Sequence, residues 1–361
     1  MASCEKQISY FMGSNTPIGF ISKFSQLVDP RMVDTAYVLK AGPGTGKSSL
    51  MHRFADFFEE KGYEVHRIYC SSDTQSLDAV FVPKLSVAIL DGTPPHVIEP
   101  AYPGAVEQVV SLYGSFDIDS LKAHREEIIS CFKENMALHA KSTLFISAAG
   151  SLLADNMRTA EEHMNQEKLC RFCERTAAAE FGRKTALKPG AEYDVFFSAI
   201  TAEGVTFHTD TLQRFCRRAY LFEDRYGCVA KEILKKLRDS AVRAGYSVIC
   251  GFCPTAPFEK MEQLVIPELQ LGFFAANKFH TPEFSDCKVV HDRRFLDENR
   301  LKDHRAKLRF NRKAAEELLN EASGFIAQAK MVHDRLESCY IAAMDFEKTD
   351  AVLEDLLDHY R

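Results

Sequence analysis

The stretch that decides the fold is AGPGTGKSS, residues 41–49. It fits the pattern of a small residue, four free positions and then Gly-Lys-Ser, and it follows an apolar segment, 36–40. Residues 47–61 after it have helical periodicity, with Gly62 as the expected C-cap. Because glycines let a backbone turn tightly and direct its N–H groups inward, the stretch predicts a phosphate-binding loop between a buried strand and a helix N-terminus.

The side chains of this loop indicate a nucleoside triphosphate, ATP or another, with Mg²⁺. Lys47 is expected to contact the β and γ phosphates, and the Ser48 hydroxyl is expected to ligate magnesium. The alternative is an ordinary glycine-rich turn, which the agreement between motif and context disfavours. The predicted nucleotide-binding residues are Gly42, Pro43, Gly44, Thr45, Gly46, Lys47, Ser48 and Ser49.

A carboxylate that ligates magnesium is expected at the end of a neighbouring apolar strand. The segment VAILD, residues 87–91, ends in Asp91 and supplies it. Asp91 is therefore predicted as a catalytic residue together with Lys47, and as a metal ligand together with Ser48. Its alternative role is a turn cap, because Asp before Gly is common in turns.

The group that would orient an attacking water is less clear, because no glutamate follows Asp91. Asp73, in CSSD at residues 70–73, is the first candidate, and a capping role fits it equally well. A structural role is expected for His96, because it recurs as His280 in the second half of the chain. The further candidates are Asp78, Thr93, His96 and Glu99.

The chain contains an internal duplication with a nearly constant spacing of about 183 residues. A linker at residues 182–192, rich in Gly, Pro and polar residues, separates predicted domains 1–184 and 190–361. Each is expected to be an α/β core with a mostly parallel sheet, covered on both sides and followed by long helices, from about residues 119 and 301. The matching positions are Tyr37 and Tyr220, GlyTyr at 62–63 and 245–246, Cys70 and Cys253, ProLysLeu at 83–85 and ProGluLeu at 267–269, and His96 and His280.

The second half lacks the chemistry of the first. Residues 225–232 read RYGCVAKE, which places Ala230 opposite Lys47 and Lys231 opposite Ser48 when the tyrosines are aligned. The same alignment leaves no carboxylate opposite Asp91. We therefore expect this half not to bind a triphosphate, whereas Arg225 is either a surface arginine or an arginine finger for the first loop.

Composition excludes several classes of protein. The chain has 361 residues, 46% hydrophobic and 27% charged, which is typical of globular proteins, and its formal charge of −6 argues against nucleic-acid binding. No apolar stretch is long enough to span a bilayer and no export signal begins the chain, so a cytoplasmic location is expected. The chain has eleven cysteines, an odd number, which favours reduced thiols over a disulfide framework. The CxxC pairs Cys170/Cys173 and Cys250/Cys253 are interpreted as free cysteines and not as zinc ligands.

The sequence resembles a poorly characterised family of bacterial P-loop ATPases that contain two tandem nucleotide-binding halves. The resemblance spans nearly the whole chain and implies a duplicated P-loop NTPase-type α/β fold with nucleotide-dependent ATPase activity. Members usually carry the loop in both halves, so this chain departs from the family at residues 225–232. The segments that carry the resemblance are NTPIGF (15–20), GPGTGKSS (42–49), CSSD (70–73), SLDAVFVPKL (76–85) and VAILDGTPPH (87–96).

Three functions fit these observations. The first is ATP hydrolysis by the N-terminal half, with the C-terminal half as a scaffold or regulator. The second is a small-molecule or nucleotide kinase, because Asp-Gly-Thr without a following glutamate suits transfer to an acceptor that provides the nucleophile. The third is an ATP-dependent switch or adaptor with little turnover, whose long helices engage a protein partner.

Overall fold

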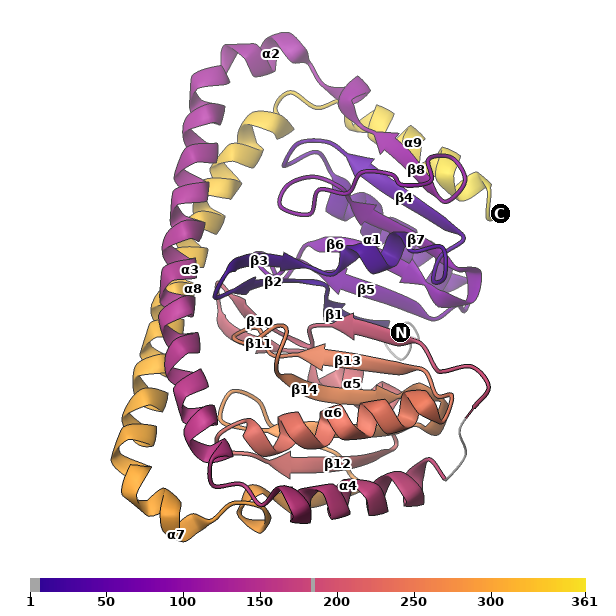
Figure 1. Ribbon diagram of the computed structural model, residues 1–361. Helices are drawn as coiled ribbons and strands as arrows, with labels where there is room; N and C mark the ends of the chain where they lie inside the picture. The colour runs from indigo at the N-terminus through magenta and orange to yellow at the C-terminus, as the bar shows by residue number, and fades with distance from the viewer. Residues whose placement is uncertain (1–6, 183–185) are drawn as a thin grey trace.

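A computed structural model describes residues 7–182 and 186–361, and it shows two similar α/β halves, each built on a mixed six-stranded sheet (Figure 1). The strand orders match: β1-β5-β6-β7-β4-β8 and β9-β13-β14-β15-β12-β16. The strands of the first sheet are β1 (Gln7–Phe11), β4 (Thr35–Lys40), β5 (Val65–Tyr69), β6 (Leu77–Val82), β7 (Val87–Asp91) and β8 (Glu107–Ser111). Those of the second are β9 (Glu192–Val195), β12 (Arg218–Glu223), β13 (Val248–Phe252), β14 (Met261–Ile266), β15 (Leu271–Ala276) and β16 (Cys287–His291).

Each sheet is mostly parallel, as predicted, but one strand runs against its neighbours. β6 is antiparallel to β5 and β7, whereas β1 with β5, β7 with β4 and β4 with β8 are parallel pairs. The sequence analysis did not anticipate β6, or the hairpins that accompany each half. These are β2 (Gly13–Thr16) with β3 (Gly19–Ser22), and β10 (Ser198–Thr201) with β11 (Gly204–Phe207).

The predicted elements around the loop are confirmed. In β4, Tyr37 and Leu39 pack on Leu50 and Phe54 of helix α1 (Lys47–Glu60), while Val38 points to the opposite face of the sheet. This alternation is the period of two expected for a strand that is buried on both faces. A buried strand and an amphipathic helix therefore position the two ends of the loop.

The two sheets meet along one side. The backbones of Phe11 and Phe196 exchange two hydrogen bonds of 2.8 and 2.9 Å, which join the β1 end of one half to the β9 end of the other. Val38 and Leu221, from central strands of the two sheets, belong to one shared hydrophobic core. The halves therefore form one packed body.

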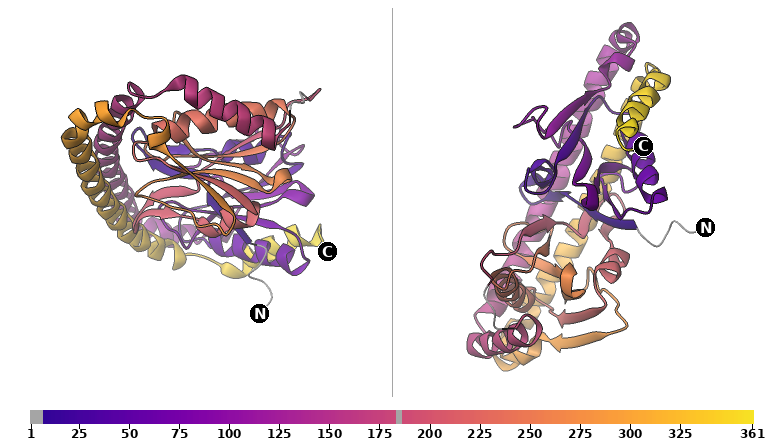
Figure 2. Two further views of the ribbon diagram at one scale, coloured as in Figure 1. Left: turned by 90° about the horizontal axis from the view of Figure 1, so that it is seen from below. Right: turned by 90° about the vertical axis from the view of Figure 1, so that its right-hand side faces the viewer.

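Two long helices of 37 residues each, α3 (Arg125–Glu161) and α8 (Arg305–Ile341), run antiparallel along one side of both sheets (Figures 1 and 2). Asn135 donates to the Ala329 carbonyl near one end of the pair and Asn156 donates to the Leu308 carbonyl near the other. The remaining helices are α2 (Ile118–Ala123), α4 (Gln166–Glu180), α5 (Thr209–Phe215), α6 (Cys228–Arg243), α7 (Glu298–Leu301) and α9 (Phe346–Asp358).

The long helices carry the chain from one half to the other. After α3, helix α4 packs on α6 in the second half, where Leu169 and Phe172 join the same core as Leu234. After α8, helix α9 packs on α1 in the first half through Leu353. Each sequence half thus gives its terminal helix to the other half. Of the predicted linker, residues 183–185 lie outside the described residues.

Across residues 7–182 and 186–361, no helix has the length and apolar character needed to cross a bilayer. The cysteines described there are free thiols, and both Cys173 and Cys250 are buried in the core of the second half.

Candidate functional site

The loop predicted to bind phosphate leaves β4 and enters α1 with the expected backbone shape. Gly46 is the N-cap of α1 in a left-handed conformation with φ of 81°, and Gly44 has φ of 66°. Side chains disfavour this region, so both positions require glycine. The Thr45 hydroxyl donates to the Gly42 carbonyl at 2.9 Å and closes the turn. The N-terminus of α1 therefore follows a tight turn built on glycines.

Lys47 and Asp91 are brought together at the carboxyl end of the sheet. β4 and β7 are parallel neighbours in which Leu39 is paired with Asp91, so Asp91 lies beside the start of the loop. The Lys47 ammonium donates to the Gly42 carbonyl at 2.7 Å and lies 3.3 Å from Asp91 Oδ2. Both side chains are largely buried, with exposed fractions of 10% and 15%.

Ser48 and Asp91 offer oxygen ligands of the kind that Mg²⁺ prefers. Ser48 Oγ accepts from the Leu77 N–H at 3.0 Å and keeps a further lone pair. Asp91 Oδ1 accepts from the N–H and the hydroxyl of Thr93, at 2.8 and 2.6 Å, while Oδ2 faces Lys47. Asp91 is thus the turn cap considered above and still has one oxygen directed at the loop. A hydroxyl and a carboxylate oxygen fit magnesium.

Asp73 closes a turn. Its carboxylate accepts from the Ser76 hydroxyl at 2.8 Å and from the Gln75 N–H at 3.3 Å, and it lies 3.6 Å from the Lys330 ammonium of α8. These contacts favour the structural alternative for Asp73, and its role as a water-orienting base stays a prediction.

Asp78 and His96 form a buried pair, with 3.1 Å between Asp78 Oδ2 and His96 Nε2. Burial acts to lower the pKa of His96, but the charges of Asp78 and Asp91 outweigh it, so the pKa is raised above the ordinary value. The acid–histidine pairing recurs in the second half, where His280 Nε2 lies 3.8 Å from Glu262. Glu99 is exposed and binds Lys40 at 2.8 Å.

The end of α8 covers the loop, which the sequence did not indicate. The Gly44 N–H donates to Glu337 Oε1 at 3.1 Å. A Cβ added at Gly44 would come within 2.8 Å of the Glu337 backbone oxygen, and one at Gly42 within 2.6 Å of the Tyr340 ring. These two glycines therefore also permit close packing against α8. The Glu337 carboxylate thus accepts a hydrogen bond from the Gly44 N–H, a group that a bound phosphate would need.

One further group of metal-binding side chains lies on α8. The ligand atoms of His333, Asp334 and Glu337 lie within 4.8 Å of one another. The three residues share one turn of a helix face and are partly or fully exposed, so the grouping alone does not identify a metal site.

The loop of the second half is shorter than the sequence alignment assumed. Helix α6 begins at Cys228 after Gly227, whose φ of 83° matches that of Gly46. Cys228 therefore stands opposite Lys47, and the predicted placement of Ala230 at that position was wrong. The alignment failed because α6 starts earlier than α1 relative to its strand and compensates with a longer helix.

A carboxylate fills the N-terminus of α6. Asp224 accepts from the N–H groups of Gly227 at 2.9 Å, Ala230 at 2.7 Å and Tyr226 at 3.3 Å. Arg225 is held within the same half by Asp292, at 2.9 Å, and by Glu298. Asp224 therefore occupies the Tyr226, Gly227 and Ala230 N–H groups at this helix N-terminus.

A scan against protein-family models, and searches of the curated proteins and of the solved structures, find no match to this chain. The duplication therefore rests on the structure itself, in which the two halves share strand order, hairpin and long helix. The resemblance to tandem P-loop ATPases stays a prediction.

Proposed function

We propose that the first half binds a nucleoside triphosphate, ATP or another, with Mg²⁺ and hydrolyses it, while the second half binds no triphosphate and serves as a scaffold or regulator. The observation that carries the proposal is the meeting of Lys47 with Asp91 beside a glycine-built helix N-terminus. A cation for the phosphates and a carboxylate for the metal side thus lie at the same edge of the sheet.

Each residue has a distinct part in this proposal. Backbone N–H groups of residues 42–48 hold the β-phosphate, and Lys47 leaves the Gly42 carbonyl to pair with the β and γ phosphates. Ser48 and Asp91 would hold Mg²⁺, which neutralises charge that develops on the phosphate oxygens. Water adds to the γ-phosphorus as the bond to the bridging oxygen breaks, and the water proton passes to solvent or a nearby base.

Release of inorganic phosphate tests this reaction. Purified full-length chain with ATP and Mg²⁺ should release phosphate without any added acceptor. Release only in the presence of an acceptor would instead support the kinase alternative. Tight binding with almost no release of phosphate would support the switch alternative. The contact between α8 and the loop also favours that alternative, because a nucleotide that enters the loop must displace Glu337.

Glu337→Gln is expected to tighten ATP binding. The wild-type carboxylate competes with a phosphate for the Gly44 N–H and repels its charge, whereas the amide has no charge and accepts more weakly. Hydrogen bonds to charged groups stabilise a structure by roughly 1.5–3 kcal/mol, and the partial exposure of Glu337 reduces this energy. We therefore expect the variant to bind ATP about tenfold more tightly, which corresponds to about 1.4 kcal/mol. Calorimetric titration with a slowly hydrolysed ATP analogue measures it.

The matched control is Glu321→Gln, which removes the same charge from an exposed position on the same helix, distant from the loop. Its affinity should equal that of the wild type. Equal affinity in Glu337→Gln as well would show that the carboxylate does not compete with the nucleotide.

Each chain is expected to bind one triphosphate, although it contains two similar halves. In the second half Asp224 takes the N–H groups of the helix N-terminus, and Cys228 replaces the lysine. The same titration should therefore give a stoichiometry near one. A value near two would contradict the proposal, and a value near one half would indicate a nucleotide shared between two chains.

A further inference from the structure

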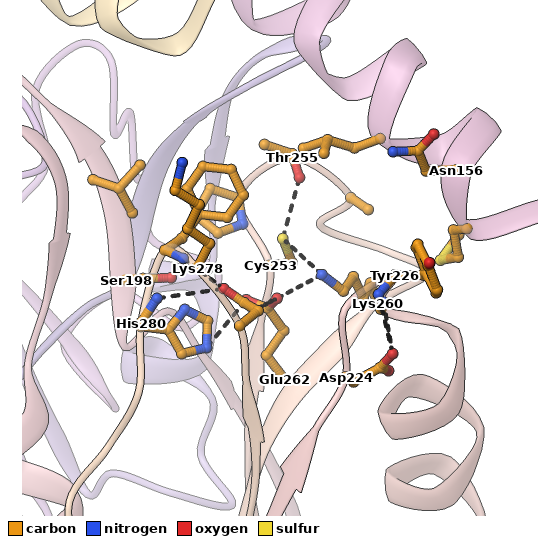
Figure 3. A pocket seen from close by; sticks show the side chains of 18 of the residues that line it. Asn156, Ser198, Asp224, Tyr226, Cys253, Thr255, Lys260, Glu262, Lys278 and His280 are labelled. Carbon is orange, nitrogen blue, oxygen red and sulfur yellow. Dashed lines mark hydrogen bonds and ion pairs between the residues drawn. The ribbon is translucent and has the colours of Figure 1, made fainter. Parts of the chain in front are cut away.

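The sheet of the second half and helix α3 line an open cavity of about 420 Å³, within the range of roughly 300–1,000 Å³ typical of small-molecule sites. It lies where β12, β13 and β15 end, beside the loop that contains Asp224 (Figure 3). This place corresponds to the loop site of the first half. Ligands of α/β proteins commonly bind at the carboxyl ends of strands, so the location itself favours a binding site.

The floor of the cavity is a buried polar cluster. Lys260 points between Glu262 and Cys253, with 2.6 Å to Glu262 Oε1 and 3.9 Å to the Cys253 sulfur (Figure 3). Asn277 donates to the same Glu262 oxygen at 3.1 Å, and Thr255 lies 3.2 Å from the Cys253 sulfur. The cluster combines donors and acceptors along one wall.

The charges of this floor balance. Burial would lower the pKa of Lys260, but Cys253 and Glu262 raise it, so the amine stays protonated. Burial would raise the pKa of Glu262, but Lys260 and His280 lower it, so the carboxylate stays ionised. Lys260 and Glu262 therefore neutralise each other. A ligand that carried a full charge would have to disturb this pair.

The same cavity is poorly suited to a phosphate group. The only helix N-terminus described at its edge is that of α6, where Asp224 accepts from the Gly227 and Ala230 N–H groups. The other cations of the lining are already paired with carboxylates: Arg225 with Asp292, and Lys278 and Arg312 with Glu316. A ligand without a phosphate therefore fits this lining best.

The side of the cavity formed by the long helices is mainly apolar, in contrast to the loop site, and its polar residues are Asn156 and Arg312. α3 and α8 have equal length, and alignment from their first residues places Met157 opposite Glu337 and Leu153 opposite His333. Met157 and Leu153 line the cavity, together with Gly150. This cavity thus lacks both a counterpart of the glycine loop and the charged helix face that covers the loop of the first half.

We propose that this cavity binds an uncharged heteroaromatic molecule of about the size of a nucleoside, without phosphate. Tyr226 and Phe279 line the cavity and add aromatic surface to it, and the Arg225 guanidinium lies over the Tyr226 ring. Lys260, Glu262 and Asn277 offer donors and acceptors to a polar edge. Apolar atoms of Met157 and Leu153 cover the opposite side.

The probes are adenosine, guanosine, cytidine and uridine, each compared with its 5′-monophosphate. The full-length Lys47→Ala chain is used, so that the first loop does not contribute. At least one nucleoside at millimolar concentration should raise the melting temperature and titrate with a stoichiometry of one. Its monophosphate should bind at least tenfold more weakly.

Two variants locate the binding. Met157→Glu places a carboxylate on the mainly apolar side formed by the long helices, and Ala154→Phe fills the cavity without adding charge; each should weaken nucleoside binding at least tenfold. Met331→Glu, at an exposed position of α8, should have no effect. An unliganded melting temperature close to that of the parent chain shows that a variant is folded.

The inference is overturned if none of the four nucleosides binds, if the monophosphates bind as well as the nucleosides, or if folded Met157→Glu and Ala154→Phe chains both bind normally. Because Lys47 is absent from all these chains, none of these results depends on whether the first half hydrolyses ATP.

Discussion

Lys47→Ala is expected to abolish the stabilisation of the chain by ATP and Mg²⁺. At a hundredfold excess over its dissociation constant, a ligand stabilises the folded state by about 2.7 kcal/mol, or roughly 2 to 4 °C in melting temperature for a chain of this size. The Lys47 ammonium already lies at the mouth of the helix N-terminus, 3.3 Å from Asp91. Its loss removes the cation that pairs with the β and γ phosphates.

The measurement is thermal unfolding with and without nucleotide. Lys133→Ala, which removes an exposed lysine of α3, is the control and should keep the full shift. A folded Lys47→Ala chain that also keeps the full shift would show that the nucleotide binds elsewhere.

Asp91→Asn is expected to lower Mg²⁺-dependent phosphate release by about a hundredfold or more while Mg²⁺-free nucleotide binding changes little. The amide oxygen can still accept the two bonds from Thr93, so the turn persists, but an NH2 group then replaces the carboxylate oxygen that faces Lys47 and could not ligate Mg²⁺. A loss of activity that is specific to the Mg²⁺-dependent reaction would therefore show that Asp91 acts as a metal ligand and not only as a turn residue.

Turnover is measured across a Mg²⁺ titration, and binding is measured in the presence of a chelator. Asp303→Asn, which removes an exposed carboxylate in the second half, is the control. If Asp91→Asn hydrolyses ATP as fast as the wild type, Asp91 is only the cap of its turn.

The parts of the site that follow from local sequence could be predicted. Strand β4, helix α1 and the glycine loop depend on neighbouring residues, and Asp91 follows because it ends an apolar strand. Strand β6 was missed, because the segment from Leu77 to Val82 is apolar on both faces and short, and such runs carry no clear periodicity.

The contacts that cross between the halves could not be predicted. Glu337 reaches the loop from 293 residues away, because α8 returns to the first half, and no local pattern encodes this path. The start of α6 was also not predicted. The segment from Tyr37 to Gly62 has the same length as that from Tyr220 to Gly245, although the second loop is two residues shorter and the helix after it is two residues longer. Long-range packing and compensating shifts of this kind leave no periodic signal.

The exchange of α4 and α9 makes the two sequence halves depend on each other for packing. Without α9 and the residues after it, α1 would lose its contacts with Leu353 and with Tyr360, which lies against Phe58, and without α4 helix α6 would lose the cover of Leu169 and Phe172. Neither sequence half is therefore a self-sufficient unit. The arrangement is that of a domain-swapped homodimer with pseudo-twofold symmetry whose two subunits have been fused end to end. Fusion fixes one copy of each subunit per molecule, which allows one copy to keep the glycine loop while the other diverges.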